Sequence, residues 1–125
     1  MADIAGRGQQ AAGTESTGML SIDNYVVDVL LRDLVGHDRQ PVAFLVYLWL
    51  AAEQQRRNEG VVQASYQEIA ESVGISKSSA QSAVGRLVRR KLLSASKENA
   101  TATPRYKVLT PWRDAGRRSG ARESH

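Results

Sequence analysis

Between residues 76 and 97 the chain carries hydroxyl, amide and guanidinium groups but no Asp or Glu. Arranged as a helix at about 100° per residue, this stretch has an apolar stripe centred near Ala80 and Leu87. The opposite face carries small polar and cationic residues, namely Ser78, Gln81, Ser82, Gly85, Arg86 and Arg89. Such groups can meet base edges and phosphates in a DNA major groove. An ordinary solvated helix face is the alternative, although such faces usually mix acidic with basic residues.

Two helices joined by a tight turn would position these side chains. Ser65 and Glu68 have the S-x-x-E spacing of a capping box, so we expect the first helix to begin after Ser65. Gly74 can adopt the left-handed conformation that ends a helix, and the hydroxyl of Ser76 can cap the second helix. The second helix would then bury one apolar stripe, made of Ala80, Ala83, Val84, Leu87 and Val88.

The stretch QEIAESVGISKSSAQSAVGRLVRRKLL resembles the helix-turn-helix of bacterial and phage winged-helix regulators of the broad GntR-like class. The match rests on four strings: Ile69-Ala70, Val73-Gly74-Ile75-Ser76, Lys77-Ser78-Ser79 and Leu92-Leu93. The chain departs at Ala80, where Val is commoner, and at Lys91, where Gly often ends the helix. The close match covers about a quarter of the chain, and a looser one covers residues 20–113. The resemblance implies a winged helix-turn-helix that binds double-stranded DNA.

A β-hairpin is expected after the second helix. Three runs are β-prone or alternate polar with apolar residues: Val61–Ala64, Leu92–Ser96 and Arg105–Leu109. A polar turn, Lys97–Thr101, joins the last two runs. In a winged helix this hairpin is the wing, whose Lys97, Arg105 and Lys107 could reach phosphate or the minor groove. The alternative is a basic solvated hairpin edge, where Lys also discourages edge-to-edge pairing.

The eleven consecutive apolar residues from Val42 to Ala52 predict a helix that is buried on most sides. Pro41 suits its first turn, and the run is too short to cross a bilayer, which needs about 20 residues. Such a helix needs cover on an extra face, either from residues 20–36 or from a second subunit. We therefore expect a homodimer built on residues 20–57.

Residues 20–36 allow two interpretations. In the first, Tyr25–Val27 is extended and Asp28 caps a short helix that Gly36 stops. In the second, one continuous helix begins at Asp23. Both interpretations provide cover for the apolar helix that follows.

Charge is divided unevenly along the chain. Residues 1–75 hold five Lys/Arg and ten Asp/Glu, which gives a formal net charge of −5. Residues 76–125 hold twelve Lys/Arg and three Asp/Glu, which gives +9. A basic half of this kind indicates a polyanionic partner. Residues 1–19 and the basic tail 114–125 lack an apolar pattern and are predicted to be disordered. One domain remains over residues 20–113, which we expect Trp112 to close by packing on the core.

Several other chemistries find no support in the sequence. There is no Cys, and the two histidines, His37 and His125, are far apart, so no metal site is expected. No nucleophile–His–acid set or phosphate-cradling glycine loop is present, so we expect neither an enzyme nor a cofactor. The N-terminus lacks the apolar region of a signal peptide, which favours a cytoplasmic protein without a membrane partner.

The sequence therefore predicts a mainly α protein with a small β-hairpin, an α+β winged helix-turn-helix that binds specific DNA sites and regulates transcription. Contacts to double-stranded DNA are expected from Ser76, Lys77, Ser78, Ser79, Gln81, Ser82, Arg86, Arg89, Arg90, Lys97 and Arg105. A homodimer would hold two recognition helices about one DNA turn, near 34 Å, apart. Two alternatives remain, a plasmid or phage replication initiator and a winged helix used as a protein-interaction module. Binding to random duplex DNA would separate the last of these from the other two.

Overall fold

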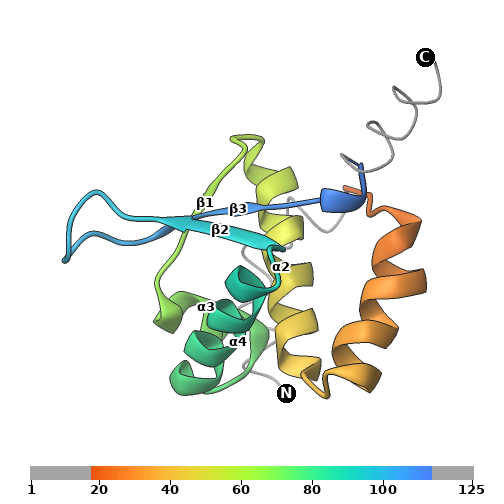
Figure 1. The fold of residues 1–125 in the computed structure, drawn as a ribbon. Coiled ribbons are helices and arrows are strands. Elements are labelled where there is room, and N and C mark those ends of the chain that lie inside the picture. Colours follow the sequence, from red (N-terminus) through yellow and green to blue (C-terminus); the bar gives the residue numbers. More distant parts are fainter. Residues whose placement is uncertain (1–17, 114–125) are drawn as a thin grey trace, which may run out of the picture.

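The computed structural model describes residues 18–113, so the predicted disordered tail and nearly all of the predicted disordered N-terminus lie outside the described residues. The elements in chain order are η1, η2, α2, β1, α3, α4, β2 and β3, where η marks a π-helical stretch. The described chain is mainly helical and has a small antiparallel sheet, which confirms the α+β class (Figure 1). Within residues 18–113, no helix is long and apolar enough to cross a membrane.

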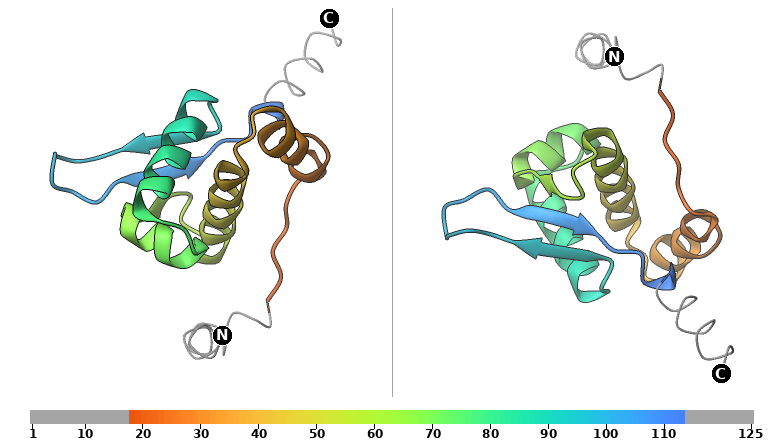
Figure 2. Two further views of the ribbon diagram at one scale, coloured as in Figure 1. Left: turned by 90° about the horizontal axis from the view of Figure 1, so that it is seen from below. Right: turned by 90° about the horizontal axis from the view of Figure 1, so that it is seen from above.

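Helix α2, Pro41–Arg57, is the spine of the core. The N-terminal helical segment lies on one side of it, and α3, α4 and the sheet lie on the other (Figure 1, Figure 2). With neighbours on both sides, α2 buries residues around much of its circumference, namely Ala43, Phe44, Val46, Tyr47 and Leu50. It ends at Asn58, whose left-handed φ of 53° stops the helix two residues before Gly60.

The N-terminal segment, defined here as residues 24–37, is helical throughout. It contains the π-helical stretches η1, Val26–Leu30, and η2, Arg32–His37. The interpretation as one continuous helix beginning near Asp23 is thus confirmed. The alternative, with an extended Tyr25–Val27 and a helix that stops at Gly36, is wrong.

Tertiary packing explains that outcome. Val26, Leu30 and Leu34 are each at most 4% exposed and are spaced by four residues, so a wide helix aligns them along one buried line. Burying this line against the core outweighs the β-propensity of the adjacent valines. Asp28, predicted as the helix cap, lies inside the first turn of η1 and is exposed.

The sheet has the order β1-β3-β2, with β3 antiparallel to both neighbours. Its strands are β1, Val62–Gln63, β2, Leu93–Ser96, and β3, Arg105–Val108. The three predicted strands are therefore confirmed, each with shorter bounds. The residues that face the core are Val62, Leu93, Tyr106 and Val108. In the sequence, two helices follow β1 and precede β2: α3, Tyr66–Val73, and α4, Lys77–Arg89.

The two ends of the described chain are joined through Asp23. Its carboxylate accepts hydrogen bonds from Trp112 Nε1 and from Arg113 Nε and Nη2, each at 2.7 Å. These bonds, led by that from Arg113, lower the pKa of Asp23 to about 2. Trp112 also stacks on Tyr25, with ring centroids 4.6 Å apart, and is partly buried against the core. The expected packing of Trp112 is thus confirmed, and it includes the N-terminal segment.

Candidate nucleic-acid interface

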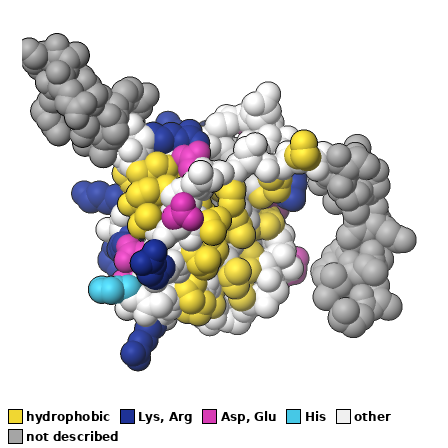
Figure 3. All heavy atoms as spheres, turned by 90° about the vertical axis from the view of Figure 1, so that its right-hand side faces the viewer, with side chains coloured by type: hydrophobic (Ala, Val, Ile, Leu, Met, Phe, Trp, Pro, Cys, Tyr) yellow, Lys and Arg dark blue, Asp and Glu magenta, His cyan; other side chains and the backbone are white. Residues whose placement is uncertain are grey.

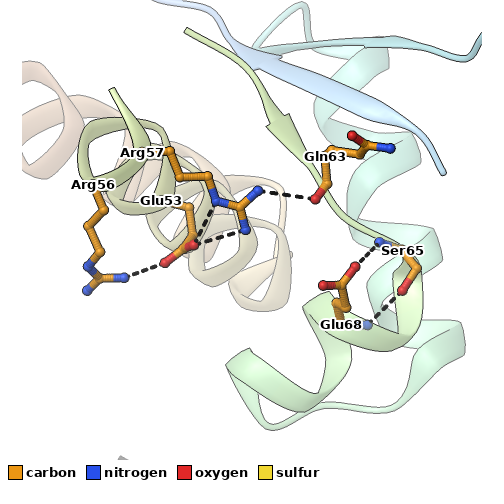
Figure 4. Close-up of polar contacts among 6 residues, drawn as sticks. All are labelled: Glu53, Arg56, Arg57, Gln63, Ser65 and Glu68. Atoms are coloured by element: carbon orange, nitrogen blue, oxygen red, sulfur yellow. Dashed lines mark hydrogen bonds and ion pairs between the residues drawn. The ribbon is translucent and has the colours of Figure 1, made fainter. Parts of the chain in front are cut away.

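Helix α3 begins with the predicted capping box (Figure 4). The backbone N–H of Glu68 donates to Ser65 Oγ at 3.1 Å, and the backbone N–H of Ser65 donates to Glu68 Oε1 at 2.9 Å. Two backbone donors that the helix would otherwise leave unpaired are thereby satisfied. Gly74 ends the helix with a left-handed φ of 89°, as predicted. These two signals fix where the turn between α3 and α4 starts.

Arg57 anchors the strand that leads into α3 to the end of α2 (Figure 4). Its Nη1 donates to the backbone oxygen of Gln63 at 3.2 Å, and its Nε donates to Glu53 at 3.3 Å. Arg56 also pairs with Glu53, at 2.5 Å. Both arginines at this helix end are therefore occupied by a carboxylate of their own helix.

Helix α4 starts at Ser76, whose Oγ accepts a hydrogen bond from the backbone N–H of Ser79 at 3.0 Å. The same hydroxyl bonds the hydroxyl of Ser79 at 2.9 Å. Two of the predicted DNA-binding serines thus have a structural use, because they hold the first turn of α4. The N–H groups of this turn point away from the helix, where the macrodipole favours a negative partner.

The buried side of α4 consists of Ala80, Ala83, Val84 and Leu87. Val88, the fifth residue of the predicted stripe, is 39% exposed, so its assignment to the core is wrong. It lies at the edge of the stripe and lines the cavity between α4 and the β2–β3 hairpin. The predicted polar face is on the outside: Ser78, Gln81, Ser82 and Arg89 are exposed, and Gly85 and Arg86 are half-buried. Lys77, in the first turn of α4, is also exposed.

The predicted DNA-contacting cations of α4 and of the hairpin differ in their partners. Lys77, Arg86 and Arg89 take part in no ion pair within residues 18–113. The Nε atom of Arg86 is buried and has no hydrogen-bond partner among the described residues. Lys97 donates to a backbone oxygen at the hairpin tip at 3.3 Å, and Arg105 forms an exposed 3.4 Å pair with Glu98. Exposed pairs of this kind are weak and exchange readily.

Arg90 has a different environment from the rest of the predicted set. Its guanidinium pairs with Asp33 at 2.7 Å and with Asp38, so it ties the end of α4 to the N-terminal segment. The hydrogen bond from Arg90 to Asp33 is the largest contribution that raises the pKa of Arg90. With two carboxylates already neutralising it, Arg90 is a poor candidate for a phosphate contact, and we leave it out of the site.

An open cavity of about 580 Å³ separates α4 from the β2–β3 hairpin. Its lining residues are Tyr66, Val84, Gly85, Val88, Arg89, Ala95, Ser96, Lys97, Pro104 and Tyr106. Arg89 stands on the helix side and Lys97 on the hairpin side, so the cavity has a cation on each wall. Burial raises the pKa of Tyr106, which keeps this lining phenol neutral. Tyr66 and Pro104 were missed by sequence reasoning, since neither carries a charge or a motif.

Gly85 lies in the middle of α4, where glycine destabilises a helix relative to alanine. A Cβ built at this position would meet only Arg89 Nη1, at 3.5 Å, which is ordinary contact with a flexible side chain. Nothing among the described residues therefore requires glycine here. Because no side chain projects from position 85, another surface can approach the backbone of α4 closely there.

The C-terminal end of α4 is closed by Lys91, the position where the resemblance favours Gly. Lys91 has a left-handed φ of 61°. Its N–H donates to Val88 O at 3.0 Å, and the N–H of Leu92 donates to Leu87 O at 2.9 Å. These two bonds are the Schellman pattern. The helix thus ends where the sequence indicated, but with a residue that is strained in this conformation.

Within residues 18–113, no three His, Asp or Glu side chains gather in a group that could hold a metal ion. Comparison of the chain with protein-family models, curated proteins and solved structures gives no match.

Proposed function

We propose that this protein is a winged helix-turn-helix transcription regulator that binds specific sites on double-stranded DNA. Helix α4 enters the major groove, and the β2–β3 hairpin is the wing beside it. The observation that carries the proposal is the exposed polar face of α4. It contains no acid, and the cations of α4, Lys77, Arg86 and Arg89, are outside every ion pair of residues 18–113.

The roles follow from side-chain length and position. Ser78, Gln81 and Ser82 lie in the N-terminal half of α4, which helix-turn-helix proteins direct at base edges. Lys77, in the first turn of α4, and Arg89, in its last turn, meet phosphates. Arg86, between them, reads a guanine or holds a phosphate.

The cavity between α4 and the hairpin supports the same arrangement. A DNA strand that leaves the groove beside α4 would pass between Arg89 and Lys97, the cations on its two walls. Arg105, whose exposed pair with Glu98 costs little to open, can join them from β3. Ser76 and Ser79 contribute through the backbone N–H groups of the turn that they hold.

The first test is binding to a labelled DNA duplex of random sequence, measured by fluorescence anisotropy. Three to five phosphate contacts per subunit predict a log–log salt slope of about −3 to −4.5 per subunit, at roughly −0.9 per contact. Between 50 and 200 mM salt, affinity should therefore fall by about 10²-fold. Absence of binding at low salt, or binding that ignores salt, would remove the proposal and favour a protein-interaction module.

A matched pair of variants locates the interface. Combined Lys77→Ala and Arg89→Ala should abolish most binding to the random duplex. Arg56→Ala removes an arginine from the end of α2, where it pairs with Glu53, and should leave binding unchanged. Selection from random DNA then gives the site. Sites within promoters support regulation of transcription, whereas an array of sites at a replication origin would replace it with replication initiation.

A further inference from the structure

Exposed apolar side chains are concentrated on one part of the molecule. Of the eleven large hydrophobic residues that are exposed within residues 18–113, nine lie between Met19 and Leu45. Viewed from the side of the N-terminal segment, hydrophobic side chains form a band, with charged side chains gathered along one flank (Figure 3). Soluble monomers rarely leave large contiguous apolar patches uncovered, so this face is a candidate interface.

The centre of the candidate interface is a line on the N-terminal segment that we name the exposed stripe: Val27, Leu31 and Val35. These residues are 49%, 38% and 37% exposed and are spaced by four, as are the buried residues of the same segment. Beside the stripe stand Asp28 and Arg32, both exposed and again four residues apart. Arg32 donates to the backbone oxygen of Asp28 at 3.2 Å, and the Asp28 carboxylate forms no ion pair within residues 18–113.

This arrangement is complementary to itself. If two copies pack antiparallel about a twofold axis at Leu31, Val27 of one copy meets Val35 of the other. A twofold axis brings the same flank of both helices together. Asp28 of one copy then lies within roughly two residues' rise, about 3 Å, of the level of Arg32 in the other. The Asp28–Arg32 pair forms twice, and these two opposite-charge contacts flank one contact between the Arg32 side chains at the axis, so the charge arrangement is attractive on balance.

We propose that the exposed stripe is the interface of a homodimer, with a second copy of this chain as its occupant. Self-complementary charge favours a second copy over an unrelated apolar partner. The N-terminal segment and the β2–β3 hairpin lie on opposite sides of α2 (Figure 1, Figure 2), so pairing through the stripe leaves the hairpin uncovered. The proposal does not depend on DNA binding, and it is tested without DNA.

The experiment is sedimentation velocity on the full chain at tens of micromolar. The chain has a mass of 13.7 kDa, so the parent should sediment at twice that mass. Leu31→Arg places two like charges on the axis and should weaken the dimer by at least about 10-fold, with an unchanged helical circular dichroism spectrum. Val61→Arg changes a residue of equal exposure, 37%, outside the stripe, and should leave the dimer intact.

Charge-reversal variants distinguish a specific homodimer from non-specific hydrophobic association. Asp28→Arg sets Arg against Arg32 of the second copy and should weaken the dimer. Combining Asp28→Arg with Arg32→Asp restores opposite charges and should recover the parent dissociation constant. A monomeric parent at 100 μM, equal effects of Leu31→Arg and Val61→Arg, or no recovery in the double variant would each overturn the proposal.

Discussion

Arg89 and Arg90 are neighbours in the sequence, but only Arg90 is paired with carboxylates, those of Asp33 and Asp38. Arg90→Ala should therefore lower the free energy of unfolding by roughly 1 kcal/mol, a value that allows for the partial exposure of the pair. Arg89→Ala should change it by less than about 0.5 kcal/mol. Urea unfolding of the two variants measures this difference.

DNA binding should rank the same two variants in the opposite order. Arg89→Ala should reduce the salt slope by about one, because one phosphate contact is lost. Arg90→Ala should leave the slope nearly unchanged. A slope that falls equally in both variants would contradict the exclusion of Arg90 from the interface.

Gln81 is long enough for a bidentate pair with adenine, whereas Arg89 lies two turns further along α4. Gln81→Ala should cost about 1–3 kcal/mol on a selected site and little on scrambled DNA. Arg89→Ala should weaken both by similar factors. Binding curves for each variant on the two DNAs check this division, and an unchanged specificity ratio in Gln81→Ala would show that the base-reading face is wrongly placed.

Asp23 gives a pH dependence whose sign can be worked out. Its folded pKa of about 2 lies below the ordinary 3.8, so its pairing with Arg113 stabilises the fold at pH values above about 4. That stabilisation is lost as the pH falls from about 4 towards 2. The difference in urea midpoint between the parent and Asp23→Asn should therefore be present at pH 5 and shrink by pH 2.5. A difference that is constant over this range would count against the Asp23–Arg113 pair.

At the scale of the element, the strained end of α4 offers a direct test. Lys91 adopts a left-handed φ that glycine reaches without steric cost. Lys91→Gly should raise the free energy of unfolding by about 0.5–1 kcal/mol, after the larger chain entropy of glycine is allowed for. Lys91→Ala removes the charge but keeps the Cβ, so it should give no such gain. Thermal unfolding of both variants measures the difference.

Gly85 separates stability from binding. Gly85→Ala should stabilise α4 by about 0.5–1 kcal/mol, because only the flexible end of Arg89 lies near the new methyl group. On the proposed interface the same methyl group should weaken DNA binding. Tighter DNA binding by Gly85→Ala would contradict the placement of α4 in the groove.

Local signals in the sequence predicted most of these elements. The capping box at Ser65, the stop at Gly74 and the cap at Ser76 all act within three or four residues, so the sequence contains them in full. The partners of Arg90 lie 52 and 57 residues away, which no local pattern encodes. The choice between two forms of the N-terminal segment likewise depended on burial against α2, a tertiary effect.

For the molecule as a whole, the division of charge along the sequence is partly cancelled by folding. Asp23 binds Arg113, and Asp33 and Asp38 bind Arg90, so acids of the first half neutralise bases of the second. The cations outside these pairs include Lys77, Arg86 and Arg89 on one helix. The uneven distribution of charge along the sequence predicted a polyanionic partner. Only the fold shows which cations are outside ion pairs and therefore able to bind such a partner.

The central strand of the sheet, β3, is also the last strand within residues 18–113. Until β3 is synthesised, β1 and β2 have no strand to pair with. Trp112 and Arg113, which follow β3, donate their hydrogen bonds to Asp23 only after that. The N-terminal segment can pack on α2 once residue 57 is made, but its bonds to Trp112 and Arg113 require about ninety residues after Asp23. Pairing of the sheet and closure at Asp23 are therefore contacts between residues far apart in the sequence, which cost loop-closure entropy before they stabilise the fold and which slow folding.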